Sequence, residues 1–296
     1  MSYEEFLEQV KGQIQAKLGK DMSVSVFPVR KNNAVLLDGL SILGQGDNLS
    51  PAIYLNSYYQ EFLNGRTLEE IGEDILDCYQ RGKRSGHFDM EPFKNPARAR
   101  ERIVCRLINY DKNRVLLRNV PHRSFLNLAI VYYYLVESRE LGGASILVKK
   151  EFLSLWRLDE EELHRIALEN TRRLLPWDFL SMSQMLHGVT STDFWREEPE
   201  LPLYILSNRE KYFGSVWITD SCVLEQIGEE LREDYYILPS SVHECMILPV
   251  SLQANVSELQ AMVREINDTQ VEPEEVLADT VYRYDRRQKR LETAAG

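Results

Sequence analysis

The chain has 296 residues, with 46 Asp and Glu against 35 Lys and Arg, which gives a formal net charge of −11 at pH 7. This length accommodates two domains of ordinary size, and a hydrophobic content of 44% is sufficient for a sizeable core. An acidic chain is not expected to coat nucleic acid, because phosphate contacts require clustered Lys and Arg.

Membrane, secreted and disulfide-rich classes are also disfavoured. The longest nearly apolar run, residues 126–136, is too short to cross a bilayer. The acidic N-terminal segment lacks the basic-then-apolar order of a signal peptide. The four cysteines lie far apart and form no CxxC pair, so we expect free thiols. The sequence therefore predicts a cytoplasmic protein.

The first elements are predicted to be a helix and a hairpin. Ser2 and Glu5 form a capping box that opens the helix. Two β-like runs follow, residues 24–30 and 34–40, and Asn33 lies between them. Because Asn tolerates the positive φ of a tight turn, the two runs are expected to pair as a hairpin.

Capping residues predict further helices along the chain. They are Thr67 with Glu70, Asn95 with Pro96, Asp159 with Glu162, and Ser257 with Gln260. The helix that starts after Asn95 is expected to continue past Leu107, because apolar residues recur there at helical spacing. Asp220 is expected to cap a helix that ends near Leu231.

β-like runs occupy much of the remaining chain. They are residues 124–136, 144–148, 203–206, 214–219, 235–238, 245–250 and 280–284. The residues after them form a basic tail that we expect to be frayed. Because strands come in adjacent runs broken by helices, the pattern favours an α+β fold with antiparallel or mixed sheets and flanking helices.

The domain division is placed at a Glu- and Pro-rich stretch, residues 197–202. This predicts an N-terminal α+β lobe, 1–195, and a C-terminal α+β lobe, 196–296, with one continuous unit as the alternative. Glycine-led strands at Gly143 and Gly214 resemble one another, so two similar β-rich lobes are one arrangement that fits the pattern.

His122, His243 and Glu244 are the candidate catalytic residues. Both histidines lie just before an apolar run, and an adjacent carboxylate can orient an imidazole. They would serve a hydrolase or a metal-dependent enzyme. The alternative, which we favour, is structural hydrogen bonding. No HExxH, GxSxG, P-loop or GxGxxG motif is present, so we expect no metal and no cofactor.

Charge is unevenly distributed along the chain. Residues 81–123 hold twelve Lys and Arg against four Asp and Glu, whereas residues 124–282 hold twelve against twenty-eight. Arg98, Arg102 and Arg106 recur every four residues and would align on one helix face. Such a stripe can bind phosphates or an acidic partner, although a solvated face is the simpler interpretation.

Three further polar residues are candidate binding residues. Asn170 interrupts an apolar helix stripe, where a polar side chain requires hydrogen-bond partners, and we expect it to tie that helix to a strand or loop. Tyr54 and Asn56 belong to an aromatic and polar cluster at a strand-to-helix turn. Tyrosine suits interfaces as well as packing, and packing is the simpler interpretation.

Five segments carry a resemblance to a known family. They are residues 51–59 (PAIYLNSYY), 119–123 (NVPHR), 170–176 (NTRRLLP), 237–244 (ILPSSVHE) and 267–279 (NDTQVEPEEVLAD). Together they resemble a family of uncharacterised proteins of anaerobic Gram-positive bacteria, known only as a domain of unknown function, over about residues 20–285. Residues 144–174 resemble a second uncharacterised bacterial family. The resemblance implies a bacterial cytosolic origin and no mechanism.

Three functions follow as hypotheses. The first is a non-enzymatic binding or regulatory protein that recognises a charged protein partner, since segregated charge suits such recognition. The second is the enzyme that uses His122, His243 and Glu244. The third is an accessory factor of a mobile genetic element that binds or imitates nucleic acid.

Overall fold

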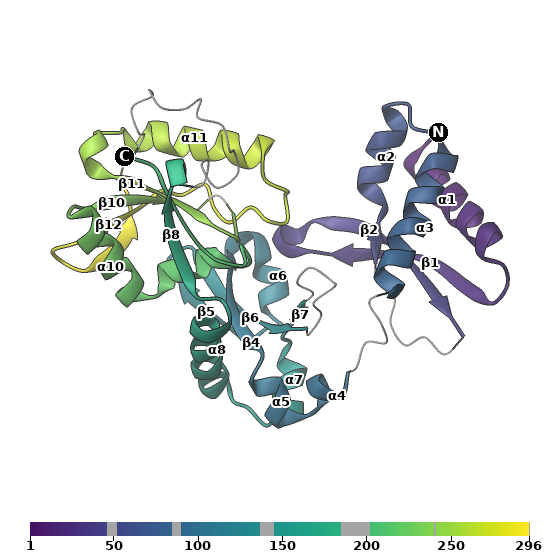
Figure 1. Cartoon of the computed structure of the whole chain (residues 1–296), viewed down its shortest axis with the longest axis horizontal. Coiled ribbons are helices and arrows are strands. Elements are labelled where there is room, and N and C mark those ends of the chain that lie inside the picture. Colours follow the sequence, from purple (N-terminus) through teal and green to yellow (C-terminus); the bar gives the residue numbers. More distant parts are fainter. Residues whose placement is uncertain (46–51, 85–89, 137–144, 185–201, 240, 296) are drawn as a thin grey trace. The chain divides into compact units, whose positions relative to one another are not determined.

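The computed structural model describes residues 1–45, 52–84, 90–136, 145–184, 202–239 and 241–295 (Figure 1). These residues fall into two compact units, which divide after Met90. The domain boundary predicted near residue 195 lies outside the described residues. The fold is α+β with antiparallel sheets and flanking helices, which confirms the predicted class.

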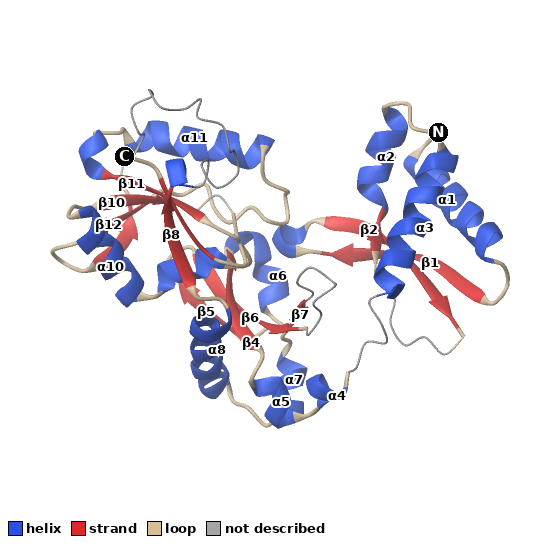
Figure 2. Cartoon of the chain, viewed as in Figure 1, coloured by secondary structure: helices blue, strands red, loops and turns tan. Residues whose placement is uncertain are grey.

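The first unit is a three-stranded antiparallel sheet packed against helices (Figure 2). Its elements are α1 (Tyr3–Leu18), β1 (Met22–Arg30), β2 (Leu36–Gly44), β3 (Ile53–Tyr54), α2 (Leu55–Leu63) and α3 (Leu68–Arg84). The capping box of Ser2 and Glu5 starts α1 as predicted. The hairpin of β1 and β2 is also confirmed, with a short 3₁₀ helix (Asn32–Ala34) at its turn and Asn33 at φ 58°.

The second unit contains a four-stranded antiparallel sheet and the helices near it. Its strands are β4 (Ile103–Asn109), β5 (His122–Phe125), β6 (Leu128–Leu135) and β7 (Ser145–Leu147). The accompanying helices are α4 (Glu91–Lys94), α5 (Pro96–Arg100), α6 (Arg114–Leu117), α7 (Lys150–Trp156) and α8 (Glu160–Leu174), with a 3₁₀ turn at Asp111–Asn113. β4 pairs with one edge of β6, while β5 and β7 share the other edge.

A six-stranded antiparallel sheet completes the second unit, in the order β13-β12-β10-β11-β9-β8. Its elements are β8 (Trp177–Ser181), β9 (Tyr204–Asn208), α10 (Ser221–Leu231), β10 (Tyr235–Leu238), β11 (Cys245–Pro249), α11 (Val256–Thr269), β12 (Tyr282–Asp285) and β13 (Arg290–Thr293), with 3₁₀ helices at Gly214–Thr219 and Val250–Leu252. Tyr236 packs towards α11, whereas Tyr235 donates a hydrogen bond to Leu224 of α10. Because successive side chains of a strand face opposite ways, α10 and α11 cover opposite faces of this sheet.

Long-range hydrogen bonds join the two sheets of the second unit. Asn109 Nδ2 donates to the carbonyl oxygen of Leu277 over 3.1 Å, and Asn127 Nδ2 donates to Thr280 Oγ1 over 2.9 Å. Trp217 Nε1 donates to the carbonyl oxygen of Leu175 over 3.0 Å. The end of β4 and the β5–β6 turn are therefore tied to the segment before β12, and the segment after β9 is tied to the residue that follows α8.

Three predicted elements are wrong. The helix after Asn95 ends at Arg100, and the residues that follow form β4, whose apolar run is rich in β-branched residues and buried on both faces. Gly214–Thr219 is a 3₁₀ helix rather than a strand, so its likeness to the strand after Gly143 has no structural counterpart. The basic tail forms β13, which pairs with β12.

Within the described residues, no helix is both long enough and apolar enough to cross a membrane.

Candidate functional site

A polar and aromatic cluster lies at the junction of the two sheets in the second unit. Its side chains come from segments far apart in the chain. They are Arg106 of β4, Tyr133 of β6, Tyr212 and Phe213 after β9, His243 before β11, and Glu275 before β12. Two residues predicted for different functions, Arg106 and His243, are thereby brought to one place.

A tight turn after β9 positions Tyr212 and Phe213. Asn208, which is buried, accepts a hydrogen bond from the Tyr212 N–H over 3.1 Å and donates to the Tyr212 carbonyl over 2.6 Å. Lys211 and Phe213 both adopt left-handed backbone conformations, with φ 48° and 59°. Because such conformations cost energy in residues other than glycine, this turn stores strain beside the cluster.

Gly214 allows the turn to pack against the strands. A β-carbon at this position would lie 2.4 Å from Ser207 Oγ and 2.5 Å from the carbonyl oxygen of His243. The same two groups are hydrogen-bonded, since Ser207 Oγ donates to the His243 carbonyl over 2.8 Å. Only glycine fits this close approach of backbone to backbone.

Both ring nitrogens of His243 have partners inside the protein. Nδ1 accepts a hydrogen bond from the Phe213 N–H over 3.3 Å, which places the ring proton on Nε2, and Nε2 donates to Glu275 Oε1 over 3.3 Å. Burial lowers the pKa of His243, and the positive charge of Arg106 lowers it further, although Glu275 opposes this shift. The imidazole is therefore neutral near pH 7 and is committed to structural hydrogen bonds.

We expect the stability of the protein to fall as pH drops below about 6.5, the value for an unfolded histidine. The folded state holds His243 with a lowered pKa, so it binds fewer protons than the unfolded state in this range. His164, whose pKa burial also lowers, contributes in the same direction. Urea unfolding at pH 7.5 and 5.5 should therefore show a smaller difference in the His243→Gln variant than in the wild type.

The double variant His243→Gln/His164→Gln should reduce this pH dependence further. An unchanged difference between pH 7.5 and 5.5 in both variants would show that carboxylates, rather than these imidazoles, set the pH dependence.

Arg106 is the cation of the cluster. Its guanidinium carbon lies 4.6 Å from the ring centre of Phe213 and 5.1 Å from that of Tyr133. Its Nε is buried and has no hydrogen-bond partner, and no carboxylate in the described part of the chain forms an ion pair with it. A buried N–H group normally has a hydrogen-bond acceptor, so the Nε–H of Arg106 is a donor available for one.

A hydroxyl pair belongs to the same cluster, because the Tyr212 ring is stacked on that of Phe213 with ring centres 3.9 Å apart. Tyr212 OH and Ser145 Oγ are hydrogen-bonded over 2.8 Å. Burial raises the pKa of Tyr212, and both the hydrogen bond with Ser145 and the charge of Arg106 oppose that rise. The neutral Tyr212 hydroxyl therefore lies within electrostatic range of the guanidinium.

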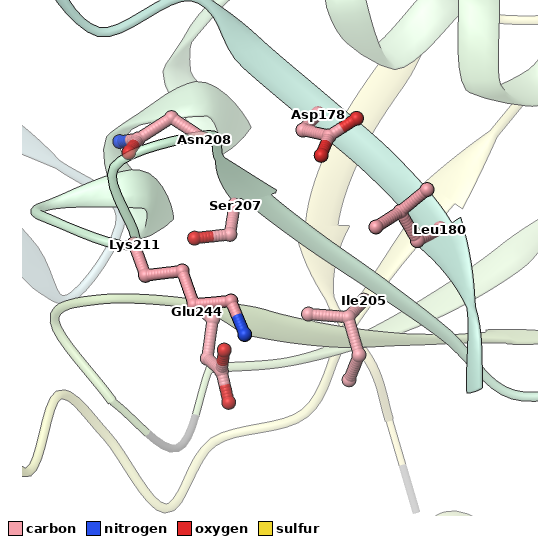
Figure 3. Close-up of a pocket in the computed structure, with 7 residues that line it drawn as sticks. All are labelled: Asp178, Leu180, Ile205, Ser207, Asn208, Lys211 and Glu244. Carbon is pink, nitrogen blue, oxygen red and sulfur yellow. The ribbon is translucent and has the colours of Figure 1, made fainter. Parts of the chain in front are cut away.

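Glu244 lines a separate pocket that is open to solvent (Figure 3). The other lining residues are Asp178, Leu180, Ile205, Ser207, Asn208 and Lys211. Ser207 and Asn208 already use their side chains to hold the turn at Tyr212. Glu244 and His243 are adjacent in sequence, but Glu275, not Glu244, is the carboxylate that accepts the hydrogen bond from the imidazole.

His122 does not join His243 in the structure. Its Nδ1 donates to the carbonyl oxygen of Val120 over 3.0 Å, and its ring lies 6.1 Å from that of Tyr110. The strand register places His122, Val131 and Arg106 in one row across β5, β6 and β4. Among the described residues, no hydrogen bond or ring contact connects His122 with His243, and no group of three potential metal ligands occurs.

The predicted arginine stripe does not form. Arg98 is exposed on α5, Arg102 follows the end of that helix, and Arg106 belongs to β4. A helix end and a change to strand geometry separate the three side chains, so they share no helix face. Of the three, Arg106 alone belongs to the cluster.

Asn170 ties α8 to the start of β4. Its Nδ2 donates to the carbonyl oxygens of Arg100 and Ile103, over 2.7 and 3.0 Å. Its Oδ1 accepts a hydrogen bond from Arg173 over 2.9 Å. These contacts use both amide hydrogens, as expected of a residue that ties the helix to the strand.

Tyr54 and Asn56 lie in the first unit. Asn56 Oδ1 accepts a hydrogen bond from the Asp38 N–H over 2.8 Å, and the Lys31 ammonium lies 4.1 Å from the ring centre of Tyr54. Both contacts tie the start of α2 and the end of β3 to the hairpin.

The buried thiols are not nucleophiles. Burial raises the pKa of Cys105 to about 12 and raises that of Cys245 as well. Their thiolate forms are therefore scarce at neutral pH.

Sequence reasoning missed Phe213, Tyr212 and Glu275. The only local signal was the tight sequence Asn208 to Gly214, which contains residue types typical of turns. Nothing near Glu275 in the sequence pointed to His243, which lies 32 residues away.

Together, these features define an α+β protein with a strained turn, and with a guanidinium that forms no ion pair among the described residues, where the two antiparallel sheets of the second unit meet. Residues 3–286 match the model of a family of unknown function, DUF5688, and the chain belongs to this family. Neither the curated proteins nor the solved structures contain a match to the chain. The resemblance to an uncharacterised family is thus confirmed, whereas the bacterial range and the second resemblance stay predictions.

Proposed function

We propose that this protein is a non-enzymatic, cytoplasmic binding or regulatory protein that recognises a charged group on a protein partner. The observation that carries the proposal is the Arg106 guanidinium, which is fixed against two aromatic rings and has no carboxylate partner in the described residues. Arginine stacked on aromatic rings is typical of protein interfaces.

The state of His243 supports binding over catalysis. A general base needs a free lone pair at neutral pH, whereas both nitrogens of this imidazole are engaged by Phe213 and Glu275. A role in which the imidazole supports the turn next to Arg106 accounts for all its contacts.

The charge distribution supports a partner with an acidic surface. Arg106 belongs to residues 81–123, which carry an excess of eight positive charges in a chain of net charge −11. Complementary charge accelerates association and selects partners. The partner is therefore expected to present an Asp or Glu residue to Arg106.

Affinity capture from a native lysate tests the proposal. The wild-type chain is expected to recover a stoichiometric acidic protein, and the Arg106→Gln variant is expected to lose it. Arg98→Gln is the matched control, since it removes the same charge from an exposed position outside the cluster. Equal recovery by all three chains, or recovery of the bait alone, would contradict the proposal.

A further inference from the structure

We propose that the Arg106 cluster is a binding site for a single carboxylate group, contributed by an acidic side chain or by the C-terminus of the partner protein. This inference rests on the proposed function and specifies its chemistry. Three features of the cluster indicate the chemical class of its ligand. They are donors without a partner, a guanidinium held between two aromatic rings, and negative charge that is already present.

The guanidinium supplies the main donors. Arginine has five N–H groups and no acceptor, and in Arg106 the buried Nε–H has no hydrogen-bond partner among the described residues. The rings of Phe213 and Tyr133, 4.6 and 5.1 Å from the guanidinium carbon, hold the side chain in place. A planar, fixed guanidinium fits the two oxygens of a carboxylate.

The hydroxyl pair supplies one more donor. Tyr212 OH and Ser145 Oγ share two hydroxyl hydrogens, and the bond between them uses one. The second hydrogen is free to bind an acceptor. The carboxylate of the cluster, Glu275, already accepts the hydrogen bond from His243.

Local charge favours a monoanion over a dianion. Glu275 and Glu244 act electrostatically on His243, as Arg106 does, so negative charge is already present around this imidazole. A carboxylate adds one negative charge to this environment, whereas a phosphate dianion would add about two. The carboxylate is therefore the preferred ligand.

Nuclear magnetic resonance on the full chain tests this with acetate, inorganic phosphate and neutral acetamide as probes. Acetate is expected to shift the Arg106 Nε–H signal saturably. It should also raise the pKa of the His243 ring, because it offsets the positive charge that lowers this pKa. The affinity for phosphate should be lower than that for acetate by a factor of about ten or more. Acetamide should neither shift the Arg106 signal nor change the pKa of His243.

Variants assign the response to the cluster. Arg106→Lys keeps the charge but loses the two parallel hydrogen bonds, and acetate affinity should fall about tenfold or more. The Tyr212→Phe substitution should lower the affinity for acetate several-fold, and Arg98→Gln should leave this affinity unchanged. Both cluster variants retain the ring or the cation at their position, and circular dichroism verifies that they fold.

Peptides distinguish the source of the carboxylate. Tighter binding by a peptide with a free C-terminus than by its amide identifies a chain terminus, and equal binding that requires an internal Glu identifies a side chain. Three results would contradict the carboxylate site. They are binding of acetate that does not saturate, tighter binding of phosphate than of acetate, and unchanged acetate affinity in Arg106→Lys.

The site and the proposed function can fail separately. If acetate does not bind while partner capture still depends on Arg106, the ligand class is wrong and the proposed function stands. If acetate binds but no partner is captured, the site stands and the proposed function fails.

Discussion

The Gly214→Ala variant is expected to lose about 2–3 kcal/mol of unfolding free energy, measured by urea denaturation. The new methyl group would overlap Ser207 of β9 and the backbone of His243, at 2.4 and 2.5 Å, and separating these two residues would break the hydrogen bond between them. The turn that holds Phe213 against Arg106 would be displaced, so acetate binding should weaken in the same variant.

Gly12→Ala is the matched control for this substitution. Gly12 lies inside α1, and a β-carbon there meets no atom within 4 Å. Because alanine has the higher helix propensity, this change should stabilise the protein by about 0.5–1 kcal/mol. Equal effects at the two glycines would contradict the close approach at Gly214.

The Trp156→Ala variant is expected to lose about 4 kcal/mol of stability in the second unit. Trp156 is fully buried, and its Nε1 donates to the carbonyl oxygen of Phe93 over 2.7 Å. Its ring packs against Phe93 and Phe152, with ring centres 5.1 and 5.6 Å apart. Removing the indole leaves a cavity and an unsatisfied carbonyl oxygen in one step.

Hydrogen exchange followed by mass spectrometry locates this loss. Exchange should accelerate in α7, β6 and the neighbouring helices, while the core of the first unit stays protected. The Leu155→Ala control changes the preceding residue, which is 44% exposed, and should cost at most about 0.5 kcal/mol. Equal destabilisation by the two variants would show that Trp156 is not a core anchor.

Local sequence patterns predicted the elements that local interactions determine. The capping box at Ser2 depends on residues three apart, and the hairpin turn depends on Asn33. The capping carboxylate at Asp159 is a contact of the same kind. Because these contacts join residues at most about three positions apart, they can be predicted from a short window of the sequence.

The helix predicted after Asn95 failed because its apolar spacing fits two structures. Residues from Ile103 onwards satisfy a helical stripe, but in the structure they are buried on both sides as a strand, which pairs with β6 along its whole length. Pairing with a strand about 20 to 30 residues further along the chain overrides the local pattern. The arginine stripe depended on that helix and failed with it.

The candidate site was predicted only in part. Arg106, His243 and Glu244 were identified as individual residues, but their partners were not. The ring of Phe213 contacts Arg106 across about half of the second unit's sequence, and Glu275 reaches His243 from a loop. No periodicity or motif in the sequence predicts such contacts, because they form only when the two sheets of the second unit pack together.

The arrangement of the two units also bears on how the chain folds during synthesis. Every described helix and strand of the first unit precedes residue 85, so this unit can fold while the ribosome is still translating the second. The second unit cannot be completed early, because Tyr282 of β12 hydrogen-bonds with Asn127 and pairs with β10. A nascent chain stalled before residue 282 would therefore present a folded first unit beside an open sheet, and such a chain is the form that chaperones would encounter.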